Sequence, residues 1–201
     1  PSAVFCFVKS NESLSAPDIQ INFTPGTHQR GMQSTLEKQA GFTMATWQHR
    51  PESQGYVKAK STDPFAHPEI QPNYLAAETD QTVILAAIKI CRKLAKTEAL
   101  KPFIVEETFP GAACQNDSEL LNSAREIGQS IYHLMGTCRM GNKNDKTAVV
   151  DAELKVHGIK NLRVIDASIM PTMVSANLNA AVMMIAEKGA DMVLGKLAAK
   201  P

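Results

Sequence analysis

Residues 79–99 carry the strongest periodic signal in the chain. Apolar residues recur there at the spacing of an amphipathic helix, and Pro102 prevents the helix from continuing. Thr79 or Asp80 is placed to cap the first turn. We expect this helix to bury one apolar stripe, made of Val83, Ile84, Ala87, Ile90, Cys91 and Leu94.

The segments before this helix favour β-strands. Residues 18–24 alternate apolar and polar side chains, as a half-buried strand does, and three further segments are rich in strand-forming residues. Residues 25–40 have no steady period and are interpreted as a loop, and the proline-rich residues 61–75 as an extended connection. The other predicted strands are residues 3–8, 41–48 and 55–60.

A second helix is predicted at residues 117–130, where Asn116 and Glu119 have the spacing of a capping box. Beyond it, the pattern indicates a short apolar strand at residues 162–167, a polar loop and a buried helix at residues 179–195. Met183 and Met184 are expected in the core of that last helix. In open α/β sheets ligands lie beyond the carboxyl ends of strands, so the polar loop is where a ligand is expected.

Composition excludes several classes of function. The 201 residues include 21 basic and 20 acidic side chains, with no basic stripe for nucleic acid. The longest apolar run, residues 180–186, is far shorter than the ~20 residues of a membrane span. The four cysteines lack zinc-site spacing and are expected as free thiols. We expect a cytoplasmic or peripherally membrane-associated protein that binds no metal and no nucleic acid.

Two motifs carry the chemistry. His133 lies in YHLMGTCRMG. Asn177, 44 residues after His133, lies in SANLNA, and this motif follows the segment VIDAS. With the upstream RPESQGYVKAKSTDPFAHPEIQPNYL, these motifs resemble, in family order, the C-terminal region of GMC (glucose-methanol-choline) oxidoreductases. The resemblance covers residues from about 18 to 195, and is greatest to choline-type, FAD-dependent alcohol dehydrogenases.

The resemblance implies that FAD accepts a hydride at N5 while His133 takes the hydroxyl proton of a primary alcohol, which becomes an aldehyde. An imidazole with an unperturbed pKa of about 6.5 suits this role. Asn177 falls on the second catalytic position, where an amide can hold the substrate oxygen. The same resemblance places three residues near the cofactor: Asp166 and Ala167 at the FAD diphosphate or ribityl chain, and Asn179 at the flavin.

The remaining histidines have no matching context and are expected in exposed loops. Cys138 and Arg139 are expected as a packed thiol and a loop ion pair rather than as a reactive pair. The histidines concerned are His28, His49, His67 and His157.

The fold implied is α+β. A mainly antiparallel sheet of five or six strands, backed by two helices, is expected in residues 1–160 as a substrate-binding domain. Residues 161–201 are expected to supply the last strand and helix of an FAD-binding domain.

A glycine-rich nucleotide fingerprint, GxGxxG, is missing from the sequence. We therefore interpret the chain as a C-terminal fragment that does not retain FAD by itself. Its expected partners are the N-terminal FAD-binding half of the same chain, a small alcohol and an electron acceptor such as a quinone. The alternative is a non-enzymatic binding module that keeps the substrate-domain fold without flavin.

Overall fold

The computed structural model describes residues 4–29 and 32–196, and the chain divides into two compact units. Unit 1 takes the residues up to 55 together with 71–130. Unit 2 takes residues 56–70 and those from 131 onward. The predicted boundary at residue 160 concerns the domains of a complete enzyme, and it stays a prediction.

Unit 1 contains an antiparallel sheet in the order β1-β2-β5. In the central strand, Ile19 pairs with Val8 on one side and with Gln48 on the other. The three strands predicted from alternation and strand-forming residues are thereby confirmed. Their bounds are Val4–Val8 for β1, Ile19–Thr24 for β2 and Thr43–Gln48 for β5.

The remaining strands form two small antiparallel pairs instead of extending this sheet. β3 (His28–Gln29) and β4 (Met32–Leu36) pair within the segment predicted as a loop, so that prediction was wrong. The sequence of residues 32–36, MQSTL, does not alternate apolar and polar residues, so it gave no strand signal. β6 (Tyr56–Lys58) and β7 (Glu69–Gln71) form the third sheet, in unit 2. Antiparallel pairing is confirmed, but not a single sheet of five or six strands.

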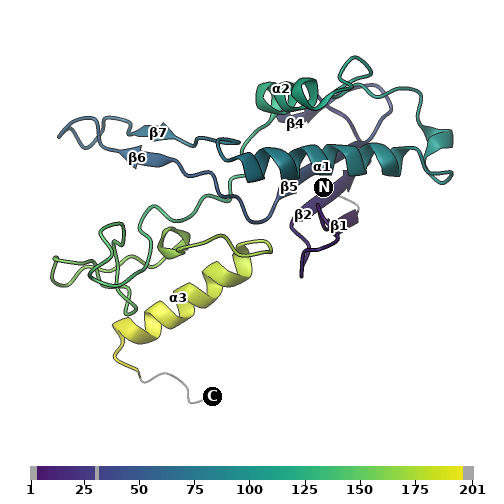
Figure 1. Ribbon diagram of the computed structural model, residues 1–201. Coiled ribbons are helices and arrows are strands. Elements are labelled where there is room, and N and C mark those ends of the chain that lie inside the picture. Colours follow the sequence, from purple (N-terminus) through teal and green to yellow (C-terminus); the bar gives the residue numbers. More distant parts are fainter. Residues whose placement is uncertain (1–3, 30–31, 197–201) are drawn as a thin grey trace. The chain divides into compact units, whose positions relative to one another are not determined.

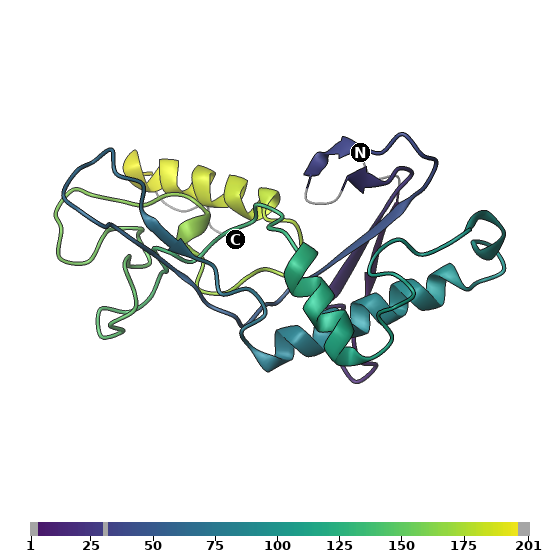
Figure 2. The ribbon, with the colours of Figure 1, turned by 90° about the horizontal axis from the view of Figure 1, so that it is seen from above.

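The helix α1 (Glu78–Ala95) packs on β2 and β5, and α2 (Asp117–Ile127) packs on α1, as Figures 1 and 2 show. A 3₁₀ turn, η1 (Lys101–Phe103), lies between the two helices in sequence. The core between sheet and α1 joins one face of β2 to the predicted stripe. Its buried members are Ile19, Ile21, Val83, Ala87 and Cys91.

The capping box of α2 is confirmed. The Asn116 side chain accepts a hydrogen bond from the Glu119 amide at 3.0 Å, and the Glu119 carboxylate accepts one from the Asn116 amide at 3.1 Å. Each satisfies an amide that the start of a helix otherwise leaves unpaired. The helix itself ends at Ile127, three residues earlier than predicted.

The other face of β2 holds a buried polar pair, Gln20 and His49. His49 Nε2 lies 2.9 Å from Gln20 Oε1, and the His49 ring meets Phe7 edge-on at 5.3 Å. His49 is 6% exposed, so its prediction as an exposed loop histidine was wrong. A buried imidazole needs a hydrogen-bond partner, and Gln20 on the neighbouring strand provides one that the local sequence does not reveal.

Asp80 fastens the start of α1 to the segment before β6. Its two carboxylate oxygens accept the backbone amides of Glu52 and Ser53, both at 2.9 Å. In return, Ser53 Oγ accepts the Ala77 amide at 3.0 Å. The predicted capping role of Thr79 or Asp80 was wrong, because the N-cap is Ala77 and Asp80 serves the incoming segment instead.

Burial raises the pKa of the Asp80 carboxyl, but hydrogen bonds from Glu52, Ser53 and Gln48 outweigh that effect and hold the pKa below its ordinary value. A carboxyl whose pKa is lower in the folded state stabilises the fold above its unfolded pKa of about 3.9. The stabilisation is lost as the pH falls through the lower, folded-state pKa.

We predict that Asp80→Asn lowers the unfolding free energy of unit 1 at pH 7 by about 1–3 kcal/mol, because one buried amide loses its acceptor. Trp47 on β5, the single tryptophan of this chain, reports the transition in urea by its fluorescence. The difference in unfolding free energy between Asp80→Asn and the parent should become smaller as the pH falls from 5 to 3. Asp117→Asn, at an exposed ion pair, is the control and should change stability by under about 1 kcal/mol. A free-energy difference that does not change with pH would contradict the role of the Asp80 carboxylate.

Unit 2 is built around α3 (Asn179–Val193) and a second 3₁₀ turn, η2 (Ala167–Ile169). The predicted strand at residues 162–167 is absent, and only the bridge between Lys155 and Arg163 marks extended pairing there. A strand needs a neighbouring ladder, and among the described residues the segment 162–167 takes part in one isolated bridge. The buried core joins Val150, Leu154, Ile169, Met170, Leu178 and Ile185.

The helix α3 confirms the last predicted helix, but its orientation differs from the expectation. Ile185 and Gly189 face the core, whereas Met183 and Met184 are 60% and 57% exposed, so their prediction as core residues was wrong. Gly189 allows α3 to approach Ile165 closely, because a Cβ there would lie 2.4 Å from Ile165 Cγ2. That methyl group sits on a β-branched carbon and has little freedom to move aside.

We predict that Gly189→Ala destabilises unit 2 even though alanine is the better helix former by up to about 1 kcal/mol. Overpacking against Ile165 should cost about 1–3 kcal/mol and outweigh that gain. Ala186→Gly, on the exposed side of the same helix, measures the propensity difference alone. The comparison is made by circular dichroism during thermal unfolding. Increased stability of Gly189→Ala would show that the contact with Ile165 is not restrictive.

Candidate active site

His133 lies in an irregular segment of unit 2 that turns sharply on either side of it. Tyr132 and Gly136 have positive φ angles of 61° and 86°. The positive φ of Gly136 is a conformation that other residues rarely adopt, so the turn itself requires this glycine. The His133 side chain is exposed at the surface of its unit.

Backbone hydrogen bonds fix the position of this segment. The Cys138 amide donates to the Ser168 carbonyl at 2.9 Å, and the Met140 amide donates to the Ile169 carbonyl at 2.8 Å. Residues 138–140 therefore run beside η2, which follows Asp166. The motif YHLMGTCRMG and the segment VIDAS, which are separate in sequence, therefore lie side by side.

Asn177 directly precedes the buried Leu178, which is the N-cap residue of α3. No side chain caps this helix end, and Asn177 and Asn179 are both exposed. The Asn179 side-chain amide donates a weak hydrogen bond to Met183 Sδ at 3.7 Å. The start of α3 thus presents its first backbone N–H groups outward.

One core anchors the segments of both candidate catalytic residues. Leu178, next to Asn177, packs in the same cluster as Met170, and Met135, two residues after His133, packs against it. The structure therefore brings the two segments to one core, from which both side chains face outward. It stays a prediction that the His133 and Asn177 side chains contact the same substrate oxygen.

The two other predicted cofactor residues lie on η2. The Asp166 side chain accepts a hydrogen bond from the Ser168 amide at 2.7 Å and so caps this turn, while remaining exposed. Ala167 is half-buried against the core. A second oxygen of the Asp166 carboxylate is available for a further hydrogen-bond donor.

Cys138 and Arg139 behave as expected. Cys138 is a free thiol, and Arg139 Nη2 lies 3.4 Å from Asp145 Oδ2. Hydrogen bonds from the Thr147 side chain and amide, with smaller help from Arg139, hold the pKa of Asp145 below its ordinary value. Arg139 Nε is buried without a hydrogen-bond partner, which sequence reasoning did not anticipate and for which we have no physical account.

The remaining groups add no further chemistry to this site. All four cysteines lie in the described ranges and are free thiols. Within residues 4–29 and 32–196, no three His, Cys, Asp or Glu side chains converge on a metal position. In the same ranges no helix has both the length and the apolar character to cross a bilayer.

Two pockets are evident in unit 1, and neither contains a residue predicted from the motifs. One lies between the end of α1 and residues 101–107, and the other lies beside α2. The sequence signal that could have drawn attention to the first is the group of lysines around the end of α1, Lys93, Lys96 and Lys101.

Comparison with known proteins identifies relatives of the chain. The mitochondrial choline dehydrogenase of Mus musculus is 43% identical over 190 residues, which make up 94% of this chain and 32% of the relative. The oxygen-dependent choline dehydrogenase of Escherichia coli (strain S88) is 42% identical over 191 residues, covering 94% and 33%. The chain thus spans about a third of the length of the curated relatives it matches.

Solved structures show the same fold. A pyridoxine 4-oxidase from Mesorbium loti superposes with a TM-score of 0.81 at 25% identity, covering 98% of this chain and 38% of the oxidase. A formate oxidase from Aspergillus oryzae superposes with a TM-score of 0.78 at 31% identity, covering 90% and 32%. These matches confirm the mixed fold of antiparallel sheets and helices.

The sequence profile described as GMC oxidoreductase matches residues 51–186, a range that contains His133, Asn177 and the segments that hold them. Because this match spans more than half of its residues, the chain belongs to the GMC oxidoreductase family.

Proposed function

We propose that this chain carries the substrate-oxidising residues of an FAD-dependent alcohol dehydrogenase that converts a primary alcohol, such as choline or a similar compound, to an aldehyde. The observation that carries the proposal is the 43% identity to a choline dehydrogenase across 94% of the chain. The outward-facing His133 and Asn177, anchored through neighbouring residues to one core, support it.

The residues around α3 fit a flavin cofactor. The uncapped start of α3 offers backbone N–H groups and a partial positive charge, which suit the electron-rich end of a flavin. The exposed Asp166 carboxylate can accept hydrogen bonds from sugar or ribityl hydroxyls. We therefore assign Asn179 and the start of α3 to the flavin ring, and Asp166 and Ala167 to the rest of FAD. When bound, the flavin supplies the hydride acceptor.

Residues of the chain itself would accept the hydroxyl proton of the substrate and bind its oxygen. His133 Nε2 or Nδ1 takes the hydroxyl proton, because a neutral imidazole accepts a proton near pH 7. The Asn177 amide donates a hydrogen bond to the same oxygen as negative charge develops on it. An asparagine does not exchange protons at this pH, so the two residues have separate roles.

Exposed apolar residues on α3 support a partner for unit 2. Met183 and Met184 are exposed within the helix. Val193 and Leu194, at its end, are 58% and 67% exposed. A helix that is apolar on several sides is normally covered by protein. We propose that the N-terminal FAD-binding half covers it, with residues 161–201 completing that domain. A quinone or similar carrier would then accept the electrons.

His133→Ala in the complete, flavin-loaded enzyme should lower alcohol turnover by about 10²–10⁴ and remove a pH dependence near neutrality, because the proton acceptor is lost. Steady-state rates from pH 5.5 to 9 measure both effects. His67→Ala, in the exposed β6–β7 hairpin, is the control and should leave the profile unchanged. An active His133→Ala enzyme with the parent pH profile would remove His133 from the mechanism.

Asn177→Ala should lower turnover by about 10²–10³, the loss of one donor to a developing oxyanion, while the flavin absorbance remains. The ratio of flavin absorbance to protein absorbance checks that the cofactor is retained. Asn144→Ala, an exposed asparagine in the same unit, is the matched control. Loss of flavin together with activity would indicate that Asn177 anchors the cofactor rather than the substrate.

A further inference from the structure

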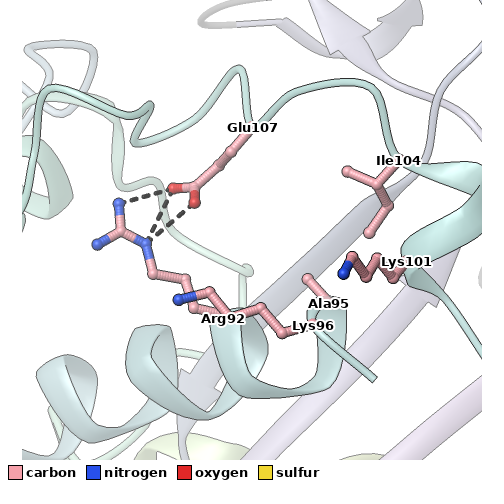
Figure 3. A pocket seen from close by; sticks show the side chains of 6 residues that line it. All are labelled: Arg92, Ala95, Lys96, Lys101, Ile104 and Glu107. Atoms are coloured by element: carbon pink, nitrogen blue, oxygen red, sulfur yellow. Dashed lines mark hydrogen bonds and ion pairs between the residues drawn. The ribbon is translucent and has the colours of Figure 1, made fainter. Parts of the chain in front are cut away.

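A second feature of the molecule lies entirely within unit 1 and does not depend on the redox chemistry. The end of α1 and residues 101–107 line an open pocket of about 390 Å³, in which Lys96 and Lys101 are exposed to solvent (Figure 3). Small-molecule sites span roughly 300–1,000 Å³, so this pocket suits a small ligand or one group of a larger one. It is lined by Arg92, Ala95, Lys96, Lys101, Ile104 and Glu107.

The Arg92–Glu107 ion pair forms one wall. Arg92 Nε donates to Glu107 Oε2 at 3.0 Å and Nη2 donates to Oε1 at 2.8 Å, so the two charges meet through a two-pronged contact. Arg92 Nη2 also donates to the Gly111 carbonyl at 3.2 Å. This arrangement fixes the segment after η1 to α1 and neutralises the only carboxylate that lines the pocket.

The two lysines are left with uncompensated charge. Neither Lys96 nor Lys101 has an ion-pair partner among the residues that the structure describes. In Figure 3 both side chains run toward the Arg92–Glu107 pair, Lys96 from the end of α1 and Lys101 from η1. The partial charge of about −0.5 at a helix C-terminus offsets only part of their two positive charges.

We propose that this pocket binds a phosphate group, with Lys96 and Lys101 as its ligands and Ala95 and Ile104 as an apolar wall for the atoms that carry it. A phosphate monoester has a charge of about −1.5 to −2 at pH 7, which matches the two free amines better than a single carboxylate does. Lysine is a common phosphate ligand, acting as a point charge.

The phosphate could belong to a soluble compound or to a lipid headgroup, and both present the same chemistry to the lysines. Phe103 and Val105, which neighbour the lining residues in sequence, are 78% and 99% exposed and could enter a lipid surface. The experiment therefore needs one arm for each source.

In the first arm, inorganic phosphate is titrated into the protein at low ionic strength and followed by calorimetry. We expect saturable binding that Lys96→Gln/Lys101→Gln weakens by about tenfold or more, because two charge-assisted contacts are lost. Each single variant, Lys96→Gln or Lys101→Gln, should weaken binding by more than Lys93→Gln, the control, which removes one charge near the same end of α1 but outside the pocket lining and should change affinity by less than about twofold. Circular dichroism verifies that all variants are folded.

In the second arm, the same proteins are sedimented with phosphatidylcholine vesicles that contain phosphatidic acid. Co-sedimentation that requires Lys96 and Lys101 but not Lys93 would identify a lipid headgroup as the source, whereas binding in the first arm alone would identify a soluble phosphate. Either result supports the site. Binding in neither arm, or an equal loss with Lys93→Gln, would overturn it, since the latter would reflect only the general charge of the helix end.

Discussion

The candidate active site depends on the backbone hydrogen bonds that join residues 138–140 to η2. The segment that carries His133 has no regular secondary structure, so no helix or sheet ladder fixes it. The amides of Cys138 and Met140 instead donate to carbonyls at Ser168 and Ile169. These bonds, together with a core in which Met135, Met170 and Leu178 meet, set where His133 and Asn177 emerge. The positions of these two candidate residues therefore depend on tertiary contacts.

Unit 1 is organised differently, by one helix on a sheet. Alternation in β2 sends Ile19 and Ile21 toward α1 and leaves Gln20 on the opposite face, where His49 satisfies it. Asp80 then joins the helix start to the incoming chain through two backbone amides. A single carboxylate thus fixes the entry to α1 as well as its orientation, and this explains why a buried acidic residue is tolerated there.

The two proposed partners rest on different properties of the two units. Exposed apolar side chains on α3 in unit 2 underlie the proposal of a protein partner, and the chain spans about a third of the choline dehydrogenases it matches. The exposed lysines at the end of α1 in unit 1 have no such explanation, because charge rather than apolar area distinguishes them. The two proposed partners would be recognised by different interactions, a phosphate by charge on unit 1 and a protein by apolar contact with unit 2.

Much of this protein follows from sequence alone. Periodicity predicts α1, α3 and the strands of the first sheet, and periodicity with a capping box predicts α2, because these signals act between residues that are close in the chain. The motifs around His133 and Asn177 identify the family, which the comparisons confirm. The structure alone decided the β3–β4 pairing, the burial of His49, the outward position of Met183 and Met184, and the absence of a strand at residues 162–167. Each of these depends on which distant segment supplies a backbone partner or a covering surface, and a local pattern contains no record of that.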